Sequence, residues 1–345
     1  MPAALAATAA TIQATLDAYP AAPVDRACFG TTDATAMAVL ADDFLRREIG
    51  AGIAAPRFYA TSTGCALGLD LDDGRAVVLK VHQPHTAPSE LAAIQRVQRE
   101  LHRRGFPAPQ PLGGPAPLGP ALAVVEAMLD VGVAPDATQP RARRVVASSA
   151  HRLLRLTADL ADDPALDRPV VPRGRTRVFP PPHSPVFDFE ATTDGADWIE
   201  DLGARAAARV AREAAGSTVL THVDFRAEHL RLDGDELVAV YDWDSLRLDA
   251  ETVAVGQIAH AFTIDWSQPI AHVPTLAEAI AFVEDYERAR GCSFDEREWR
   301  VVRASWVYAT AYGARCEHAL LGADVDPVPD AFRDRLAAHG ADWLR

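Results

Sequence analysis

The 345-residue sequence predicts an α+β protein, with a small β-rich lobe followed by a larger, mainly helical lobe. Three observations predict this class. Short strand-like segments gather between residues 57 and 81, helical periodicity dominates after residue 252, and 49% hydrophobic residues suffice for a sizeable core. We place the small lobe at residues 1–125 and the helical lobe at residues 126–345.

The small lobe is expected to start with a helix and three strands. Apolar residues recur at helical spacing over residues 34–49, which predicts an amphipathic helix. Apolar and β-branched runs predict strands at Arg57–Ser62, Ala66–Leu71 and Ala76–Val81. Residues 72–74 (DDG) have the composition of a tight turn, so the second and third strands should form an antiparallel hairpin.

A helix and a fourth strand complete this lobe. Pro88 and Ser89 open the helix, with Ser89 as the N-cap, and Gly105 closes it. The apolar segment Ala121–Met128 predicts a buried strand. The apolar face of the helix consists of Leu91, Ile94, Val97 and Leu101.

The large lobe is predicted to be helical apart from a few short strands. Proline is concentrated in residues 163–186, which predicts a surface loop. Short strands at Leu230–Leu232 and Leu237–Tyr241 flank a D-G-D turn and predict a hairpin. Helices are expected at residues 139–159, 196–214, 253–266, 276–288 and 298–320.

Composition excludes several classes of function. The net charge of −14 argues against nucleic-acid binding, because neutralising phosphates needs clustered Lys and Arg. No apolar run is long enough to span a membrane, and residues 1–25 lack the basic start of a signal peptide. The four cysteines have no zinc or disulfide spacing, so a reducing, cytoplasmic location is expected. The sequence does not indicate an oligomeric state.

The negative charge lies in one half of the chain. Residues 183–345 contain 15 basic and 30 acidic residues, whereas residues 1–182 are nearly neutral. This half either presents a solvated acidic surface or attracts a cationic ligand by electrostatic steering.

Two aspartates of the large lobe have a spacing suited to phosphoryl transfer. Asp224 lies in residues 221–229 (THVDFRAEH), just after a short apolar strand, and Asp242 ends the apolar strand of residues 238–244 (VAVYDWD). A hairpin between them would bring the two carboxylates together. Magnesium-assisted phosphoryl transfer needs one carboxylate to hold the metal and another to orient and deprotonate an acceptor hydroxyl.

This stretch resembles the catalytic core of the aminoglycoside phosphotransferase / choline kinase-like superfamily, which has the two-lobed protein kinase-like fold. The family pattern is H-G-D-x-x-x-x-N, then an apolar strand ending in I-D-W-[DE]. The resemblance makes Asp224 the catalytic aspartate, Asp242 the metal-binding aspartate and Asp244 the acidic residue after the tryptophan. It covers roughly residues 35–320 and implies ATP and Mg²⁺ as cofactors, with a small hydroxyl-bearing molecule as acceptor.

Lys80 is the only lysine among 34 basic residues. It ends the third strand, where the family places the lysine that holds the α- and β-phosphates, and a compact ammonium suits a diphosphate. The resemblance implies that a glutamate of the following helix pairs with it. Helical phase puts Glu90 in the middle of the buried stripe and Glu100 about 80° to one side, so we expect Glu90.

Two further segments are expected to contact the nucleotide by their position. Ser62, Thr63 and Gly64 occupy the place of the family's phosphate-covering loop, where backbone N–H groups face phosphate oxygens. Glu126 and Met128 occupy the place of the hinge, whose backbone groups bind adenine.

Three residues depart from the family pattern. Val223 replaces the glycine, and His229 replaces the asparagine that helps to hold a metal. The His229 imidazole could bind metal or donate a hydrogen bond to a phosphate. Arg226, two residues after Asp224, is expected to stabilise charge on the transferring phosphate. His222 is expected to brace the loop through backbone contacts.

The sequence therefore predicts an ATP-dependent phosphotransferase acting on a small, cationic molecule. The acceptor is expected against the helices containing Asp265, Glu284 and Glu317. Two alternatives stay open: a nucleotide-binding pseudokinase without turnover, and a metal-dependent hydrolase. The hydrolase would use as ligands His222, Asp224, His229, Asp242 and Asp244.

Overall fold

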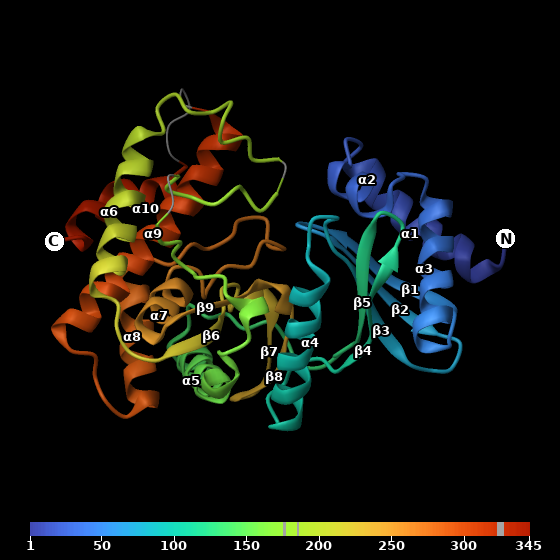
Figure 1. Cartoon of the computed structure of the whole chain (residues 1–345), viewed down its shortest axis with the longest axis horizontal. Coiled ribbons are helices and arrows are strands. Elements are labelled where there is room, and N and C mark those ends of the chain that lie inside the picture. The colour runs from blue at the N-terminus through green and yellow to red at the C-terminus, as the bar shows by residue number, and fades with distance from the viewer. Residues whose placement is uncertain (175–176, 185, 323–327) are drawn as a thin grey trace. The chain divides into compact units, whose positions relative to one another are not determined.

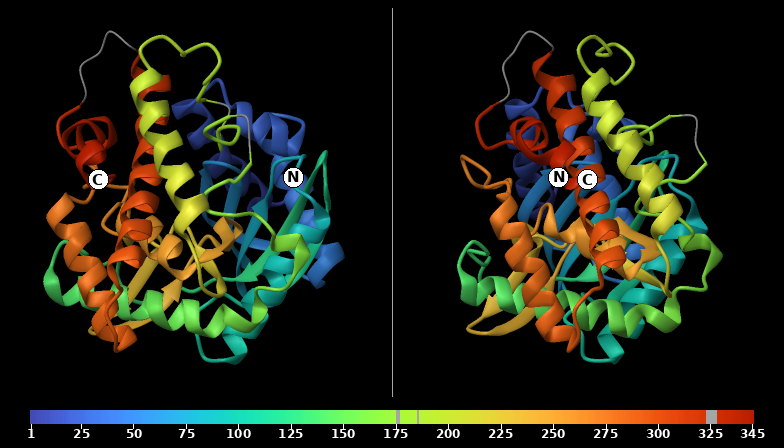
Figure 2. Two further views of the ribbon diagram at one scale, coloured as in Figure 1. Left: turned by 60° about the vertical axis from the view of Figure 1, so that its left-hand side comes forward. Right: turned by 90° about the vertical axis from the view of Figure 1, so that its left-hand side faces the viewer.

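The computed structural model describes residues 1–174, 177–184, 186–322 and 328–345. The chain forms two units (Figures 1 and 2). The first consists of Met1–Arg103 and Ala108–Asp130 with His183 and Ser184, and the second of Arg104–Pro107, Val131–Pro182 and Val186–Arg345. The division at Asp130 lies a few residues beyond the expected boundary, and the predicted α+β class is confirmed.

The first unit is built on one antiparallel sheet of five strands. The strand order is β1-β2-β3-β5-β4, so β3 lies in the centre between β2 and β5. The predicted hairpin joins β2 and β3, with Ala66 opposite Lys80. The strands are β1 (Ile53–Thr61), β2 (Cys65–Leu71), β3 (Ala76–Val81), β4 (Pro111–Leu118) and β5 (Ala121–Ala127).

Helices cover both faces of this sheet (Figure 1). The helices α1 (Ala3–Ala18), α2 (Pro23–Phe29) and α3 (Ala34–Ile49) share one hydrophobic core with the sheet. That core contains Leu79 and Val81 of β3. Successive strand residues alternate between faces, so Lys80 faces the other side. There the helix α4 (Pro88–Arg103) covers the sheet.

Several elements of this unit differ from the prediction. Ser89 is not the N-cap, because α4 already begins at Pro88, and proline is tolerated in the first turn since its missing N–H would have no helical acceptor. The helices α1 and α2 and the strand β4 were not predicted. The sequence of β4, PLGGPAPL, has no β-branched residue, and its pairing with β5 overrides this weak local preference.

The second unit is mainly helical. In Figure 2 the long helix α9 runs beside α6. Among the described residues, no helix is both apolar enough and long enough to cross a membrane. The helices are α5 (Pro140–Thr157), α6 (Asp197–Glu213), α7 (Glu251–Ala259), α8 (Leu276–Arg290), α9 (Glu296–Leu321) and α10 (Phe332–Trp343).

Two small antiparallel sheets of this unit carry the motif residues. The predicted hairpin is confirmed as β7 (Leu230–Asp233) and β8 (Glu236–Val240). The other sheet pairs β6 (Thr218–His222) with β9 (Leu246–Ala250), and β9 was not predicted.

The helix expected to reach residue 266 ends at Ala259. The following turns offer carbonyl oxygens to the motif: Phe262 O accepts from Ala227 N at 3.0 Å and Ile264 O from Glu228 N at 3.2 Å. A continuous helix would use these carbonyls internally, so ending α7 early frees them to support the loop.

Candidate active site

The motif residues lie in connections between short strands of the second unit. Asp224 follows β6, and Asp242 follows β8. The pairing of β6 with β9 and of β7 with β8 brings the connection that contains Asp224 next to the connection that contains Asp242. Two backbone bonds close the arrangement: Val223 N donates to Ser245 O at 3.3 Å, and Tyr241 N to His229 O at 2.9 Å.

His222 links the two connections, as predicted for a bracing residue. Its imidazole is fully buried, with Nε2 2.8 Å from Tyr241 O and Nδ1 3.0 Å from Ser245 Oγ. Burial lowers the pKa of His222 to about 4, so the ring is neutral at pH 7. Because a carbonyl only accepts, Nε2 carries the proton and Nδ1 accepts from the Ser245 hydroxyl.

Asp242 has an unusual backbone conformation. Its φ of 64° and ψ of 52° are left-handed, which costs a non-glycine residue roughly 1 kcal/mol or more. The main chain of Ser245 closes the turn, since its N donates to Asp242 O at 3.4 Å. The turn leaves the Asp242 side chain 37% exposed, so the carboxylate is accessible to a ligand.

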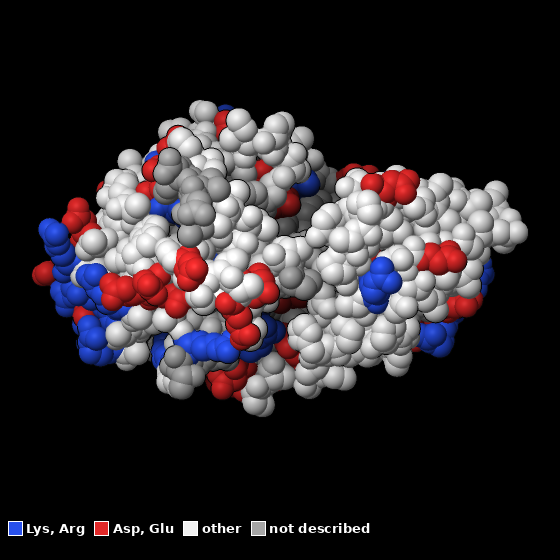
Figure 3. Space-filling view, turned by 90° about the horizontal axis from the view of Figure 1, so that it is seen from above, with Lys and Arg blue, Asp and Glu red and all other residues white. Residues whose placement is uncertain are grey.

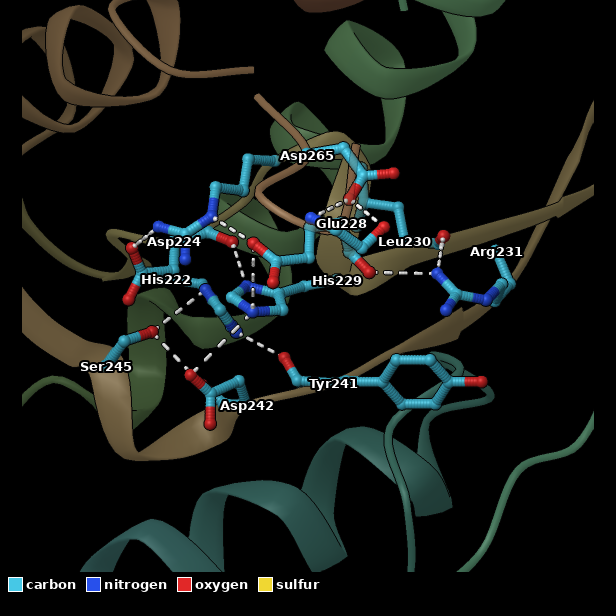
Figure 4. Close-up of polar contacts among 12 residues, drawn as sticks. His222, Asp224, Glu228, His229, Leu230, Arg231, Tyr241, Asp242, Ser245 and Asp265 are labelled. Atoms are coloured by element: carbon cyan, nitrogen blue, oxygen red, sulfur yellow. Dashed lines mark hydrogen bonds and ion pairs between the residues drawn. The ribbon is translucent and has the colours of Figure 1, made fainter. Parts of the chain in front are cut away.

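His229 lies between the two aspartates (Figure 4). Its Nδ1 is 3.0 Å from the backbone O of Asp224, so Nδ1 carries a proton that it donates. Its Nε2 faces two carboxylates, 3.9 Å from Asp242 Oδ2 and 4.0 Å from Glu228 Oε2. One imidazole therefore spans from the main chain of Asp224 to the side chain of Asp242.

Arg226 forms ion pairs with both acidic residues around it. Its Nη1 contacts Asp224 Oδ1, and its Nε lies 3.2 Å from Glu228 Oε2. Burial raises the pKa of the Asp224 carboxyl, but the opposing effect of nearby positive charges, Arg226 first, holds it below its usual value. Asp224 is therefore a carboxylate at neutral pH and can accept a hydrogen bond from a hydroxyl.

The residues fit a divalent cation that is bound partly by a ligand. Among the described residues, no three His, Cys, Asp or Glu side chains gather closely enough to form a complete metal site. Mg²⁺ commonly takes one or two protein carboxylates and completes its shell with phosphates and water. Both nitrogens of His222 are already hydrogen-bonded, so the five-ligand hydrolase site is wrong.

The acidic residues expected to line the acceptor site have structural partners. Asp265 accepts from Ser267 N at 2.9 Å within its own turn. Glu317 accepts from the N–H groups of Phe332 and Arg333, both at 2.8 Å, at the start of α10. Acidic and basic side chains are interspersed on the face of the second unit seen in Figure 3.

Lys80 lies on the central strand β3 of the first unit, opposite Ala66 and Val124. Its side chain lies on the α4 side of the sheet, the side from which Glu90 of α4 also comes. Glu100, the other candidate glutamate, forms an ion pair with Arg103 at 2.6 Å.

The turn between β1 and β2 contains Ser62, Thr63 and Gly64. Ser62 N donates to Gly64 O at 3.0 Å, and Gln83 Nε2 donates to Thr63 O at 3.0 Å. A Cβ on Gly64 would lie 2.6 Å from the carbonyl O of Val81. Close packing against the main chain of Val81 therefore requires a residue without a side chain at this position.

Glu126 and Met128 lie at the end of β5. Met128 N donates to Ala76 O at 3.0 Å, so this donor serves the sheet. Glu126 is buried, and its Oε2 accepts from Gln98 Nε2 at 2.9 Å, which ties α4 to β5.

Sequence reasoning missed three polar residues of this region. Ser245 and Glu228 contact the motif residues, and Arg247 follows on β9. Ser245 lies three residues after Asp242, a spacing at which a hydroxyl reaches back to a turn carbonyl, so this residue was within reach of local reasoning. The position of Arg247 depends on the pairing of distant strands.

Comparison with known proteins places these features in a family. The sequence matches the model of the phosphotransferase enzyme family over residues 46–304. No curated protein sequence matches the chain.

Three solved structures show the same fold at low identity. An amicoumacin kinase in complex with AMP-PNP, Ca²⁺ and Ami is 11% identical, with a TM-score of 0.61 over 84% of this chain and 87% of that chain. An ethanolamine kinase of Plasmodium vivax is 12% identical, with a TM-score of 0.55 over 96% and 94%. A spectinomycin phosphotransferase in complex with ADP and spectinomycin is 12% identical, with a TM-score of 0.53 over 88% and 92%.

Proposed function

Since the chain belongs to the phosphotransferase enzyme family, we propose that it transfers the γ-phosphate of ATP to a hydroxyl group of a small molecule. The observation that best supports this proposal is the position of His229, whose Nδ1 donates to the main chain of Asp224 and whose Nε2 lies 3.9 Å from the carboxylate of Asp242. Two structures of similar fold contain AMP-PNP or ADP, which supports a nucleotide as the donor.

Asp224 orients the acceptor hydroxyl and takes up its proton as the new phosphate ester forms. Its carboxylate is 31% exposed, so a hydroxyl can approach it. Arg226 holds the Asp224 side chain in one orientation and provides positive charge beside the reacting groups.

Asp242 would hold the divalent cation, which neutralises phosphate charge when it is bound. With its proton on Nδ1, a neutral His229 has a lone pair on Nε2 toward Asp242, so His229 would be the second protein ligand. Lys80, supported by Glu90, would hold the α- and β-phosphates, and the turn at Ser62, Thr63 and Gly64 would cover them.

Two isosteric variants test the proposal. Asp224→Asn and Asp242→Asn should each lower acceptor-dependent ADP release at least about 100-fold, because each removes one carboxylate that the transfer requires. Asp233→Asn is a matched control, since Asp233 is exposed at the β7–β8 turn, and it should keep wild-type activity. Near-wild-type turnover in either site variant would contradict the mechanism.

The choice of metal tests His229 separately. Imidazole nitrogen binds softer ions such as Mn²⁺ better than it binds Mg²⁺, which prefers oxygen ligands. Mn²⁺ should therefore support activity better than Mg²⁺ in the wild type. His229→Asn, which supplies an amide oxygen, should reverse that preference. An unchanged preference would remove His229 from the metal site and leave the roles of Asp224 and Asp242 intact.

A nucleotide-binding protein without turnover is the second candidate. The ion pair of Arg226 with Asp224 favours it, because a guanidinium already occupies the carboxylate that the reaction needs. Calorimetry with ATP and Mg²⁺, combined with the ADP-release assay, separates the two. Nucleotide binding without transfer to any acceptor would favour this candidate.

A further inference from the structure

We propose that Arg247, with Arg168 beside it, binds an anionic group of the acceptor, such as a carboxylate or sulfate, close to Asp224. The inference rests on the proposed function, in which Asp224 orients the acceptor hydroxyl. It makes the acceptor a hydroxylated small molecule that carries negative charge, in place of the cationic molecule predicted from the charge balance.

Strand pairing puts three polar side chains in one row across a sheet. β6 and β9 are antiparallel with Thr221 opposite Arg247, and directly opposed residues share a face. Leu248 also forms a parallel bridge with Pro169, so the preceding residue, Arg168, comes beside Arg247 on that face. The row therefore runs from β6 across β9 to the proline-rich segment.

Arg247 has no acidic partner within ion-pairing distance among the residues that the structure describes. Its Nη1 donates to the carbonyl O of Leu246 at 2.6 Å. By contrast, the buried Arg315 of this unit contacts a carboxylate, that of Glu200, at 3.1 Å. A guanidinium taken partly out of water without a counter-charge is unfavourable, so Arg247 has unused capacity for an anion.

A second positive charge strengthens this requirement. Burial, followed by the charge of Arg247, lowers the pKa of Arg168 to about 10. Burial also lowers the pKa of Arg247, against the opposing charges of Asp224 and Asp244. An anion bound by Arg247 would also be attracted by the neighbouring positive charge of Arg168.

Thr221, at the other end of the row, has an unsatisfied hydroxyl. The residue is fully buried, and its Oγ1 has no hydrogen-bond partner among the described residues. Buried hydroxyl groups are nearly always hydrogen-bonded. Thr221 therefore places an unpaired donor directly beneath Arg247 in this row.

The surroundings of Arg247 indicate which reactant carries the anion. The negative charges that act on Arg247 are those of Asp224 and Asp244, both in the second unit, and Tyr312 of the same unit lies nearby. The Tyr312 ring packs edge-on against Phe179, at 5.8 Å between ring centroids. Lys80 and the β1–β2 turn, which are proposed to contact the nucleotide phosphates directly, lie in the first unit, whereas Asp242 of the second unit would meet them only through a cation. The anion therefore belongs to the acceptor, and the aromatic rings suit its apolar part.

Sulfate tests the anion site without any need for turnover. The melting temperature of the full chain is measured by tryptophan fluorescence in sulfate and in chloride at equal ionic strength. Sulfate stabilises proteins in general, and this non-specific rise in melting temperature should be the same in the wild type and in all variants. Sulfate bound at the proposed site raises the melting temperature further. Arg247→Gln and Arg168→Gln should each reduce this additional rise by at least half.

The matched control is Arg205→Gln, because Arg205 is exposed on α6 with a side-chain exposure of 52%. It should keep the full sulfate-dependent shift. Equal shifts in the wild type and all three variants would overturn the anion site.

A kinetic measurement tests whether the anion belongs to the acceptor. ADP release is screened with hydroxylated compounds in matched sets that differ only in a carboxylate, a neutral group or an ammonium, such as gluconate, glucitol and glucamine. The best acceptor should be anionic, and Arg247→Gln should raise its KM at least tenfold while changing the KM for ATP less than twofold. A cationic best acceptor, or a larger effect on ATP, would overturn the proposal.

The two arms separate this inference from the proposed function. A sulfate shift lost in Arg247→Gln, with no compound releasing ADP, would support the anion site and contradict the phosphotransferase. Turnover unaffected by Arg247→Gln, with no specific sulfate shift, would overturn the anion site and support the phosphotransferase.

Discussion

Acidification should destabilise the second unit through His222. The pKa of this buried imidazole is about 4 in the folded protein, against an ordinary value of 6.5. A histidine with a lowered folded-state pKa takes up a proton on unfolding between these two pH values. The free energy of unfolding should therefore fall as the pH is lowered from 6.5 to 4, and this contribution is fully present only above pH 6.5.

The size of the effect follows from the two pKa values. At pH 5.0 the unfolded imidazole is almost fully protonated, whereas the folded one remains mostly neutral. The difference lowers the free energy of unfolding by about 2 kcal/mol relative to pH 7.5. The physical cause is burial, because a positively charged imidazolium is costly at a position that water does not reach.

Urea unfolding followed by tryptophan fluorescence measures this contribution, because all six tryptophans belong to the second unit. His222→Gln can still donate to Tyr241 O but does not titrate. Between pH 7.5 and 5.0 the wild type should lose about 2 kcal/mol more than this variant. His339→Gln, a half-exposed histidine of α10, should lose as much as the wild type. Equal losses in the wild type and His222→Gln would refute the reasoning.

Three substitutions should lower the free energy of unfolding in the same assay at pH 7.5. Ser245→Ala leaves Nδ1 of His222 without its donor and should cost about 1–3 kcal/mol, so a neutral result would mean that water replaces the hydroxyl. Gly256→Ala would put a Cβ 2.3 Å from the carbonyl O of Val302 and should cost at least about 2 kcal/mol, and a smaller loss would show that α7 and α9 can separate freely. Asp295→Ala removes the N-cap of α9 and should cost about 1 kcal/mol, most of which Asp295→Ser should restore if capping is the cause.

Short-range patterns were enough for much of the fold and of the motif. The helix over residues 34–49 and the strand Ala76–Val81 have the predicted bounds, because amphipathic periodicity and turn residues act within a few positions. The β7–β8 hairpin was predictable for the same reason. These elements position Lys80 and the loop around Asp224.

Elements with weak local preferences were beyond the reach of the sequence. The strand β4 contains glycine and proline and exists because β5 pairs with it. The helix α7 ends at Ala259, inside an apolar stretch, where Phe262 and Ile264 offer their carbonyls to the loop that contains Glu228. Both outcomes depend on partners distant in the chain, whose contacts outweigh local propensity.

The anion site proposed for the acceptor depends on tertiary structure alone. Net charge suggested a cationic ligand, but charge summed over half a chain does not say which groups face Asp224. Strand register places Arg247 opposite Thr221 and brings Arg168 alongside Arg247, although these two residues are 26 and 79 positions away from Arg247 in the chain. Local patterns determine which residues lie on strands, whereas only the long-range pairing of those strands determines which side chains share a face.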